Sequence, residues 1–144
     1  MRRGDEVLLG MKKRRFGTGK WNGFGGKLLE GETIEAALLR EMNEEIGVTV
    51  AEESLEKVAN LVFLWKNGLH VNVHTYVVKS WTGEPQESEE MAPRWFKINE
   101  IPFDAMWADD KHWLPLVLAG KKIEAEFHFT EDGNDFEWMD VKEV

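Results

Sequence analysis

The sequence predicts an α+β fold, built as an α/β/α sandwich. Most apolar segments are short runs or alternate with polar residues, as strands do, and turn residues separate them. One long amphipathic helix is expected mid-chain and a second helix near the end. The 144 residues contain nothing that resembles an interdomain linker, so residues 1–144 are expected to form one domain.

The composition excludes several classes of protein. The chain has no cysteine, which excludes disulfides and thiolate zinc sites and favours a reducing compartment. No apolar run could span a membrane, and the N-terminus lacks the apolar region of a signal peptide. The net charge of −9 argues against general nucleic-acid binding, which needs a basic face. We therefore expect a cytoplasmic protein without membrane or nucleic-acid partners.

The charge is unevenly distributed. Residues 1–27 carry eight Lys and Arg against two acidic residues, a local balance of +6, and the other 117 residues carry −15. A basic segment that leads into a glycine-rich loop and an acidic helix suggests a phosphate-bearing ligand bound with a divalent metal. A solvated basic strand end is an equally good interpretation of the charge alone.

The first half of the chain contains a strand, a glycine-rich segment and the long helix. Residues 6–13 have an apolar centre and are expected to form a strand, whereas residues 14–26 hold five glycines, which favours turns. For the helix, Thr33 is expected as the N-cap and Gly47 as a left-handed C-cap.

The second half predicts two hairpins with a loop, a strand and a helix between them. Asn67-Gly68 predicts a type I′ turn, and Asp132-Gly133 a second turn. Asp109 or Asp110 is expected to cap the second helix, with Pro115 in its first turns and an end near Gly120. The expected strands are 57–66, 69–80, 94–98, 122–130 and 135–141, residues 82–93 form a polar loop, and the helix passes through 113–119.

The long helix carries carboxylates on its apolar face. At 100° per residue, Glu41 and Glu45 fall within the arc of Ile34, Leu38 and similar apolar residues, and Glu44 lies at its edge. Carboxylates on an inward face are unfavourable unless they are paired or hold a metal. At spacings of three and four residues, these three can converge on one hard cation such as Mg²⁺.

The same stretch has a recognisable pattern. Gly26, five residues, Glu32, seven residues and then Arg40-Glu41-Met42-Asn43-Glu44-Glu45-Ile46-Gly47-Val48 resemble the Nudix box at every constrained position. The resemblance implies a Nudix fold with a mixed central sheet. Its usual first strand is expected to be shortened or absent, because only five residues precede Glu6.

The resemblance also implies hydrolysis of a nucleoside diphosphate derivative with Mg²⁺, or with Mn²⁺ in its place. Glu41, Glu44 and Glu45 are expected to act as a catalytic and metal-binding set, with Gly25 offering a carbonyl and Glu90 a further carboxylate to the metal. For Glu90, the neighbouring Glu89 and a solvated acidic turn are the alternatives. Arg40, the fourth catalytic candidate, could pair with Glu44 or with Glu32.

Three further segments, 7–31, 90–96 and 101–110, are similar to the MutT-homologue branch, which hydrolyses oxidised purine nucleoside triphosphates such as 8-oxo-dGTP and 2-hydroxy-dATP to the monophosphate and pyrophosphate. Asn22 is then expected to bind the base, Trp107 to stack on it, and Asp109 and Asp110 to read its edge. The remaining expected substrate-binding residues are Lys12, Phe16, Phe24, Gly25, Gly26, Lys27 and Ala108.

Several alternatives stay open from the sequence. Asp109 and Asp110 could be a cap with a solvated neighbour, or a pair in which one carboxyl keeps its proton. The substrate could instead be a dinucleotide polyphosphate, a nucleotide sugar or a normal dNTP, and a catalytically silent nucleotide-binding module is a further possibility. We expect a monomer, with a dimer as the alternative.

Overall fold

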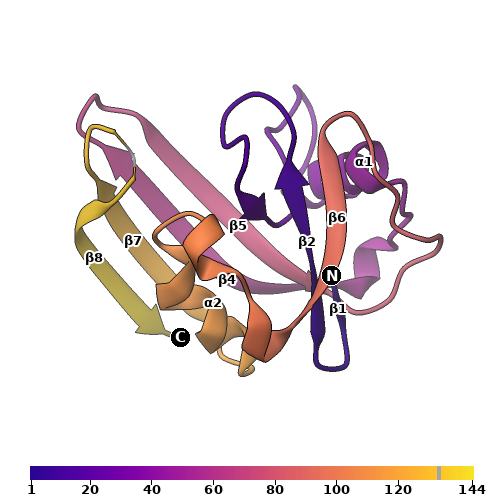
Figure 1. Cartoon of the computed structure of the whole chain (residues 1–144). Coiled ribbons are helices and arrows are strands. Elements are labelled where there is room, and N and C mark those ends of the chain that lie inside the picture. Colours follow the sequence, from indigo (N-terminus) through magenta and orange to yellow (C-terminus); the bar gives the residue numbers. More distant parts are fainter. Residues whose placement is uncertain (133) are drawn as a thin grey trace. The chain divides into compact units, whose positions relative to one another are not determined.

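A computed structural model describes residues 1–132 and 134–144 (Figure 1). The chain forms two compact units. The first comprises Met1–Glu56 and Val77–Ala105, and the second Lys57–Tyr76 and Met106–Val144. The expectation of one domain stays a prediction. In the described part of the chain, neither helix has the length and apolar character needed to cross a membrane.

The sheet of the first unit is organised around β2 (Glu6–Lys12). It pairs antiparallel with β1 (Arg2–Arg3), β3 (Trp21–Asn22) and β6 (Met91–Lys97). The expected strand at residues 6–13 is confirmed, with its end at Lys12. Strand β6 begins three residues earlier than expected. It therefore includes Pro93, which lies opposite Gly10. Proline is tolerated in a strand that pairs on one side, as β6 does here.

Helix α1 (Ile34–Ile46) has both predicted caps. The Thr33 hydroxyl accepts a hydrogen bond from the Ala36 N–H at 3.1 Å. Gly47 is left-handed at φ 73°, and its N–H donates to the Asn43 carbonyl at 2.9 Å. Met42 and Ile46 are buried against a core that includes Leu8, Val48, Val50, Val78 and Met91. The amphipathic interpretation of this helix is therefore confirmed.

The second unit contains a mixed sheet in the order β5-β4-β7-β8. Its strands are β4 (Leu55–Trp65), β5 (His70–Val78), β7 (Ile123–Phe129) and β8 (Phe136–Glu143). Strands β4 and β7 are parallel, and β7 and β8 antiparallel. Helix α2 (Asp110–Leu118) packs against β7, as Figure 1 shows. Phe127 of β7 is fully buried and stacks on Phe63, with ring centroids 5.8 Å apart.

The type I′ turn predicted at Asn67-Gly68 was wrong. Gly68 has φ 89°, but Asn67 does not have the positive φ that a type I′ turn needs. Instead, the Leu69 carbonyl accepts from the Trp65 N–H, and the Gly68 N–H donates to the Trp65 carbonyl, both at 3.0 Å, so the loop has three residues. Pro115 is the sixth residue of α2, within its first two turns as expected, because the helix begins at Asp110. The turn expected at Asp132-Gly133 includes Gly133, which lies outside the described residues.

Candidate active site

Glu45 is the most buried acidic side chain of α1, with 3% of its surface exposed. Its Oε1 accepts a hydrogen bond from the Gly25 N–H at 2.8 Å, which joins the glycine-rich loop to the helix. The pKa of Glu45 is raised to about 7, chiefly by burial and also by the negative charges of Glu41 and Glu90. The Gly25 N–H and Lys12 act in the opposite direction. The inward carboxylate that the helical spacing predicted is thus present.

Arg40 holds the loop before α1 onto the helix. Its guanidinium makes a two-point contact with Glu32, from Nε to Oε2 at 2.8 Å and from Nη2 to Oε1 at 3.0 Å. Nη1 reaches Glu41 at 3.0 Å and Glu44 at 3.2 Å, and Nη2 donates to the Lys27 carbonyl at 3.1 Å. Both partners proposed for Arg40 are therefore found, and the contact with Glu32 lowers the pKa of that carboxyl.

Gly26 leaves room for the Glu41 side chain. A Cβ at position 26 would collide with the Glu41 carboxylate, whereas a Cβ at Gly23 would meet nothing within 4 Å. Glu41 is 19% exposed and Glu44 57% exposed. The close approach of backbone to carboxylate explains why glycine suits position 26. From the sequence, Gly26 was expected only to bind the substrate.

Glu90 contacts the basic segment more closely than Glu89, whose Oε2 accepts from Arg14 Nη1 at 3.4 Å. The Glu90 side chain is 23% exposed and that of Glu89 is 87% exposed. Arg14 donates to Glu90 Oε1 from Nε at 2.9 Å and from Nη2 at 2.5 Å. Lys13 pairs with Glu87 at 3.0 Å. The basic segment and the acidic loop therefore neutralise each other, which neither interpretation of the charge distribution had included.

The four candidate carboxylates fit a hard cation by chemistry. Among the described residues, no three Asp, Glu or His side chains are grouped closely enough to hold an ion as they lie. Each candidate has another partner: Glu41 and Glu44 bind Arg40, Glu45 binds Gly25 and Glu90 binds Arg14. Glu41 and Glu90 both disfavour ionisation of the buried Glu45, a repulsion that a divalent cation would relieve.

Other expected substrate residues of the first unit are placed as follows. Lys12, at the end of β2, has its Nζ 3.8 Å from Glu90 Oε2. Asn22 is exposed on β3, and its Oδ1 accepts from the Gly23 N–H at 2.9 Å. Phe16 is 73% exposed, and Phe24 packs partly buried on the core. None of these contacts tests whether the four residues bind the substrate, so their roles stay predictions.

The Asp109-Asp110 pair lies at the start of α2 in the second unit, and the two side chains are 3% and 5% exposed. Asp109 stands at the N-cap position but makes no side-chain cap bond; its Oδ2 accepts from Trp113 Nε1 at 2.8 Å. Burial raises the pKa of both carboxyls. The pKa of Asp110 rises to about 8, and the negative charge of Asp109 is the second-largest cause of that rise. Asp109 therefore does not cap α2 with its side chain, and the role of the pair in reading a base stays a prediction.

Asp110 also has an unused polar atom. Its Oδ2 is buried and has no hydrogen-bond partner among the described residues. A protonated carboxyl with a free oxygen can both donate and accept, as the purine-edge hypothesis requires. Trp107 and Ala108, directly before the pair, are partly buried.

A protein-family comparison matches the Nudix domain over residues 1–117. The chain belongs to the Nudix family. The pattern from Gly26 to Val48 is its Nudix box, and the hydrolases of this family generally use a divalent metal. The Nudix fold predicted from the sequence is confirmed by solved structures: a MutT protein from Bacillus halodurans matches with a TM-score of 0.82 and 29% identity, over 96% of this chain and 90% of that one.

Curated Nudix relatives are more similar in sequence. An oxidized purine nucleoside triphosphate hydrolase from Danio rerio is 52% identical over 124 residues, which are 85% of this chain and 78% of the relative. A protein of the same name from Mus musculus is 48% identical over 126 residues, or 87% and 80% of the two chains. The resemblance to the MutT-homologue branch is thus confirmed.

Sequence reasoning missed the arginines next to the Nudix machinery. Arg14 and Arg15 were counted only as part of a basic segment, yet both contact Glu90, at 2.5 Å from Arg14 Nη2 and 3.5 Å from Arg15 Nη1. A signal was present, because a run of four basic residues and a loop with four glutamates lie in the same small protein. Their pairing depends on the register of β2 with β6, which the sequence does not fix.

Proposed function

We propose that this chain is a Mg²⁺-dependent pyrophosphohydrolase of oxidised purine nucleoside triphosphates, such as 8-oxo-dGTP and 2-hydroxy-dATP. It would release the monophosphate and pyrophosphate and so remove damaged nucleotides before DNA synthesis uses them. The observation that carries the substrate class is the buried Asp109-Asp110 pair, in which burial raises the pKa of both carboxyls. The two relatives of about 50% identity, named for this activity, support the same substrate.

The metal would be held by carboxylates of the Nudix helix and by two further groups. Glu41, Glu44 and Glu45 supply oxygens from α1, Glu90 supplies a fourth carboxylate, and the Gly25 carbonyl supplies a neutral oxygen. When bound, a divalent ion neutralises charge on the phosphate chain and favours ionisation of an attacking water. All of these protein ligands are oxygen atoms, which suits Mg²⁺, or Mn²⁺ in its place.

The chain's own residues orient these groups and the substrate. Arg40 fixes Glu41 and Glu44 through charge-assisted hydrogen bonds, so that they do not rotate freely. The Gly25 N–H holds one oxygen of Glu45 and leaves the other available. Lys12 carries a positive charge next to Glu90 and would bind a phosphate oxygen.

The base would be recognised by polar and aromatic groups. Asn22 is an exposed amide that can both donate and accept, and Trp107 offers a ring on which a purine stacks. Asp110 donates from its protonated carboxyl while Asp109 accepts. Phe16, Phe24 and Ala108 would make apolar contacts, and Gly26 and Lys27 would lie along the phosphate chain.

The test is pyrophosphate release with Mg²⁺ from 8-oxo-dGTP, 2-hydroxy-dATP, dGTP and a dinucleotide polyphosphate. We expect turnover of both oxidised nucleotides and slower turnover of dGTP. Turnover of dGTP at the same rate would refute the selectivity for damaged bases, and preferred turnover of the dinucleotide would assign another Nudix substrate. A protein that cleaves none of the four would be a nucleotide-binding module.

A further inference from the structure

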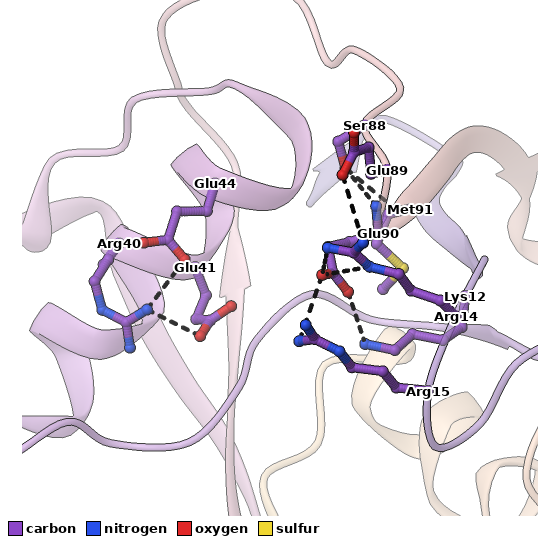
Figure 2. A network of polar contacts seen from close by, with 10 residues as sticks. All are labelled: Lys12, Arg14, Arg15, Arg40, Glu41, Glu44, Ser88, Glu89, Glu90 and Met91. Atoms are coloured by element: carbon purple, nitrogen blue, oxygen red, sulfur yellow. Dashed lines mark hydrogen bonds and ion pairs between the residues drawn. The ribbon is translucent and has the colours of Figure 1, made fainter.

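Glu90 is bound on both of its oxygens by positive side chains. Oε1 accepts from Arg14 Nε and Nη2, at 2.9 and 2.5 Å, and lies 3.5 Å from Arg15 Nη1. Oε2 lies 3.8 Å from Lys12 Nζ. Figure 2 shows the carboxylate facing all three cations. One carboxylate thus contacts three positive side chains, and Arg14 has a second, longer contact from Nη1 to Glu89 Oε2 at 3.4 Å.

The backbone fixes this arrangement. Lys12 is paired with Met91 in the register of β2 and β6, and the Lys13 N–H donates to the Glu90 carbonyl at 2.9 Å. Arg15 then reverses the chain at φ 67°, and the Thr18 N–H donates to its carbonyl at 3.2 Å. Across residues 1–132 and 134–144, Arg15 is the one non-glycine residue with positive φ, a conformation that is unfavourable for a side chain with a Cβ.

Glu90 is also held close to α1. The next residue, Met91, packs in one core cluster with Met42 and Ile46 of that helix. Glu90 therefore lies between the helix that carries the proposed metal ligands and the cations Arg14 and Arg15. These are competing demands on one carboxylate, because an oxygen that accepts from a guanidinium is less available to a metal.

We propose that Arg14 and Arg15 are phosphate-binding residues that Glu90 occupies until the metal and the triphosphate enter together. Glu90 then exchanges its arginine partners for the metal, and the two guanidiniums bind oxygens of the phosphate chain. This inference rests on the proposed function, in which Glu90 is a metal ligand. No covalent bond changes in the exchange; one set of charge-assisted contacts replaces another.

The exchange has a thermodynamic consequence. Metal alone must displace the arginines from Glu90 without giving them another anion, and triphosphate alone must displace Glu90 without giving it another cation. Together, each ligand supplies the missing partner, so each strengthens the binding of the other by the same factor. Arg14 weakens binding of the metal alone and strengthens binding of the metal with the triphosphate.

The experiment measures Mn²⁺ binding by electron paramagnetic resonance, with and without a dGTP analogue that has a methylene bridge between its α and β phosphates. Arg14→Gln is compared with Lys13→Gln, which removes the same charge one residue away. The Lys13 side chain binds Glu87 and the Ser88 carbonyl, not the Glu90 carboxylate. Arg14→Lys, which keeps the charge but cannot make two contacts to one oxygen, is the conservative variant. Urea unfolding checks that all variants fold.

For the unaltered protein we expect the analogue to strengthen Mn²⁺ binding at least about fivefold. Arg14→Gln should bind Mn²⁺ alone about two- to fivefold more tightly, the range for a partly exposed ion pair, and should lose most of the strengthening by the analogue. Lys13→Gln should resemble the unaltered protein, and Arg14→Lys should lie between the two.

Weaker binding of Mn²⁺ alone by Arg14→Gln would overturn the inference, because Arg14 would then position Glu90 rather than compete for it. An unchanged effect of the analogue in Arg14→Gln, or equal behaviour of Arg14→Gln and Lys13→Gln, would also overturn it. The titrations need no turnover. A failure of the proposed function would instead appear as absence of pyrophosphate release by the unaltered protein.

Discussion

Asp110→Asn tests the electrostatics of the base-reading pair. Asp110 is 5% exposed, its Oδ2 has no partner among the described residues, and burial, followed by the charge of Asp109, raises its pKa to about 8. An asparagine amide keeps a hydrogen-bond donor at this position, but it does not ionise. The substitution therefore removes the titration and keeps the size and the donor.

The sign and size of the effect follow from linkage. In the unfolded chain Asp110 ionises near 3.8, whereas burial keeps the folded carboxyl protonated up to about 8. Between these values the folded state binds more protons than the unfolded state, so the free energy of unfolding falls as pH rises. The fall is at most about 1.4 kcal/mol per pH unit, or roughly 3 kcal/mol from pH 5 to pH 7. Asp110→Asn does not undergo this loss.

The assay is urea unfolding of both proteins from pH 4 to pH 8.5. The free energy of unfolding of Asp110→Asn, relative to the unaltered protein, should rise by about 1–3 kcal/mol between pH 5 and pH 7 and level off above pH 8. Asp104→Asn, at an exposed aspartate, is the matched control for the loss of one carboxylate. A flat difference for Asp110→Asn would refute the reasoning, because Asp110 would then be ionised in the folded protein.

Two further substitutions test the Nudix helix. Glu45→Gln should lower pyrophosphate release at least about a hundredfold, as expected when a reacting carboxylate is lost. The thermal midpoint should not fall, because an amide is less costly to bury than a carboxylate. Activity above a tenth of normal would exclude Glu45 from the site. Gly26→Ala should lower kcat at least about tenfold, because its Cβ displaces the Glu41 carboxylate, while Gly23→Ala should change it less than about twofold. Equal effects of the two alanines would show that Glu41 tolerates displacement.

The elements that the sequence predicted best are those with local causes. The caps of α1 need only Thr33 and Gly47, and the burial of Met42 follows from the helical period. The turn after Trp65 was predicted wrongly because Asn-Gly also suits a three-residue loop, in which only the glycine needs positive φ. The early start of β6 escaped prediction because Pro93 usually argues against a strand.

The candidate site divides in the same way. Glu45 was expected inside from its position on the helix, and it is buried. The contacts of Arg40 with Glu32 and Glu44 follow from spacing along the chain and the helix. The hydrogen-bonded ion pair of Arg14 and Glu90 joins residues 76 positions apart. The hydrogen bond from Trp113 to Asp109 depends on where α2 begins. Neither contact could therefore be predicted from the sequence.

The most direct test of the proposed function is a competition between 8-oxo-dGTP and dGTP in one reaction with Mg²⁺, with products separated by chromatography. We predict that 8-oxo-dGMP and pyrophosphate appear together and that kcat/KM favours the oxidised nucleotide at least about tenfold. Loss of this preference in Asp109→Asn or Asp110→Asn would tie it to the buried pair. Equal consumption of the two nucleotides, or release of inorganic phosphate in place of pyrophosphate, would contradict the account.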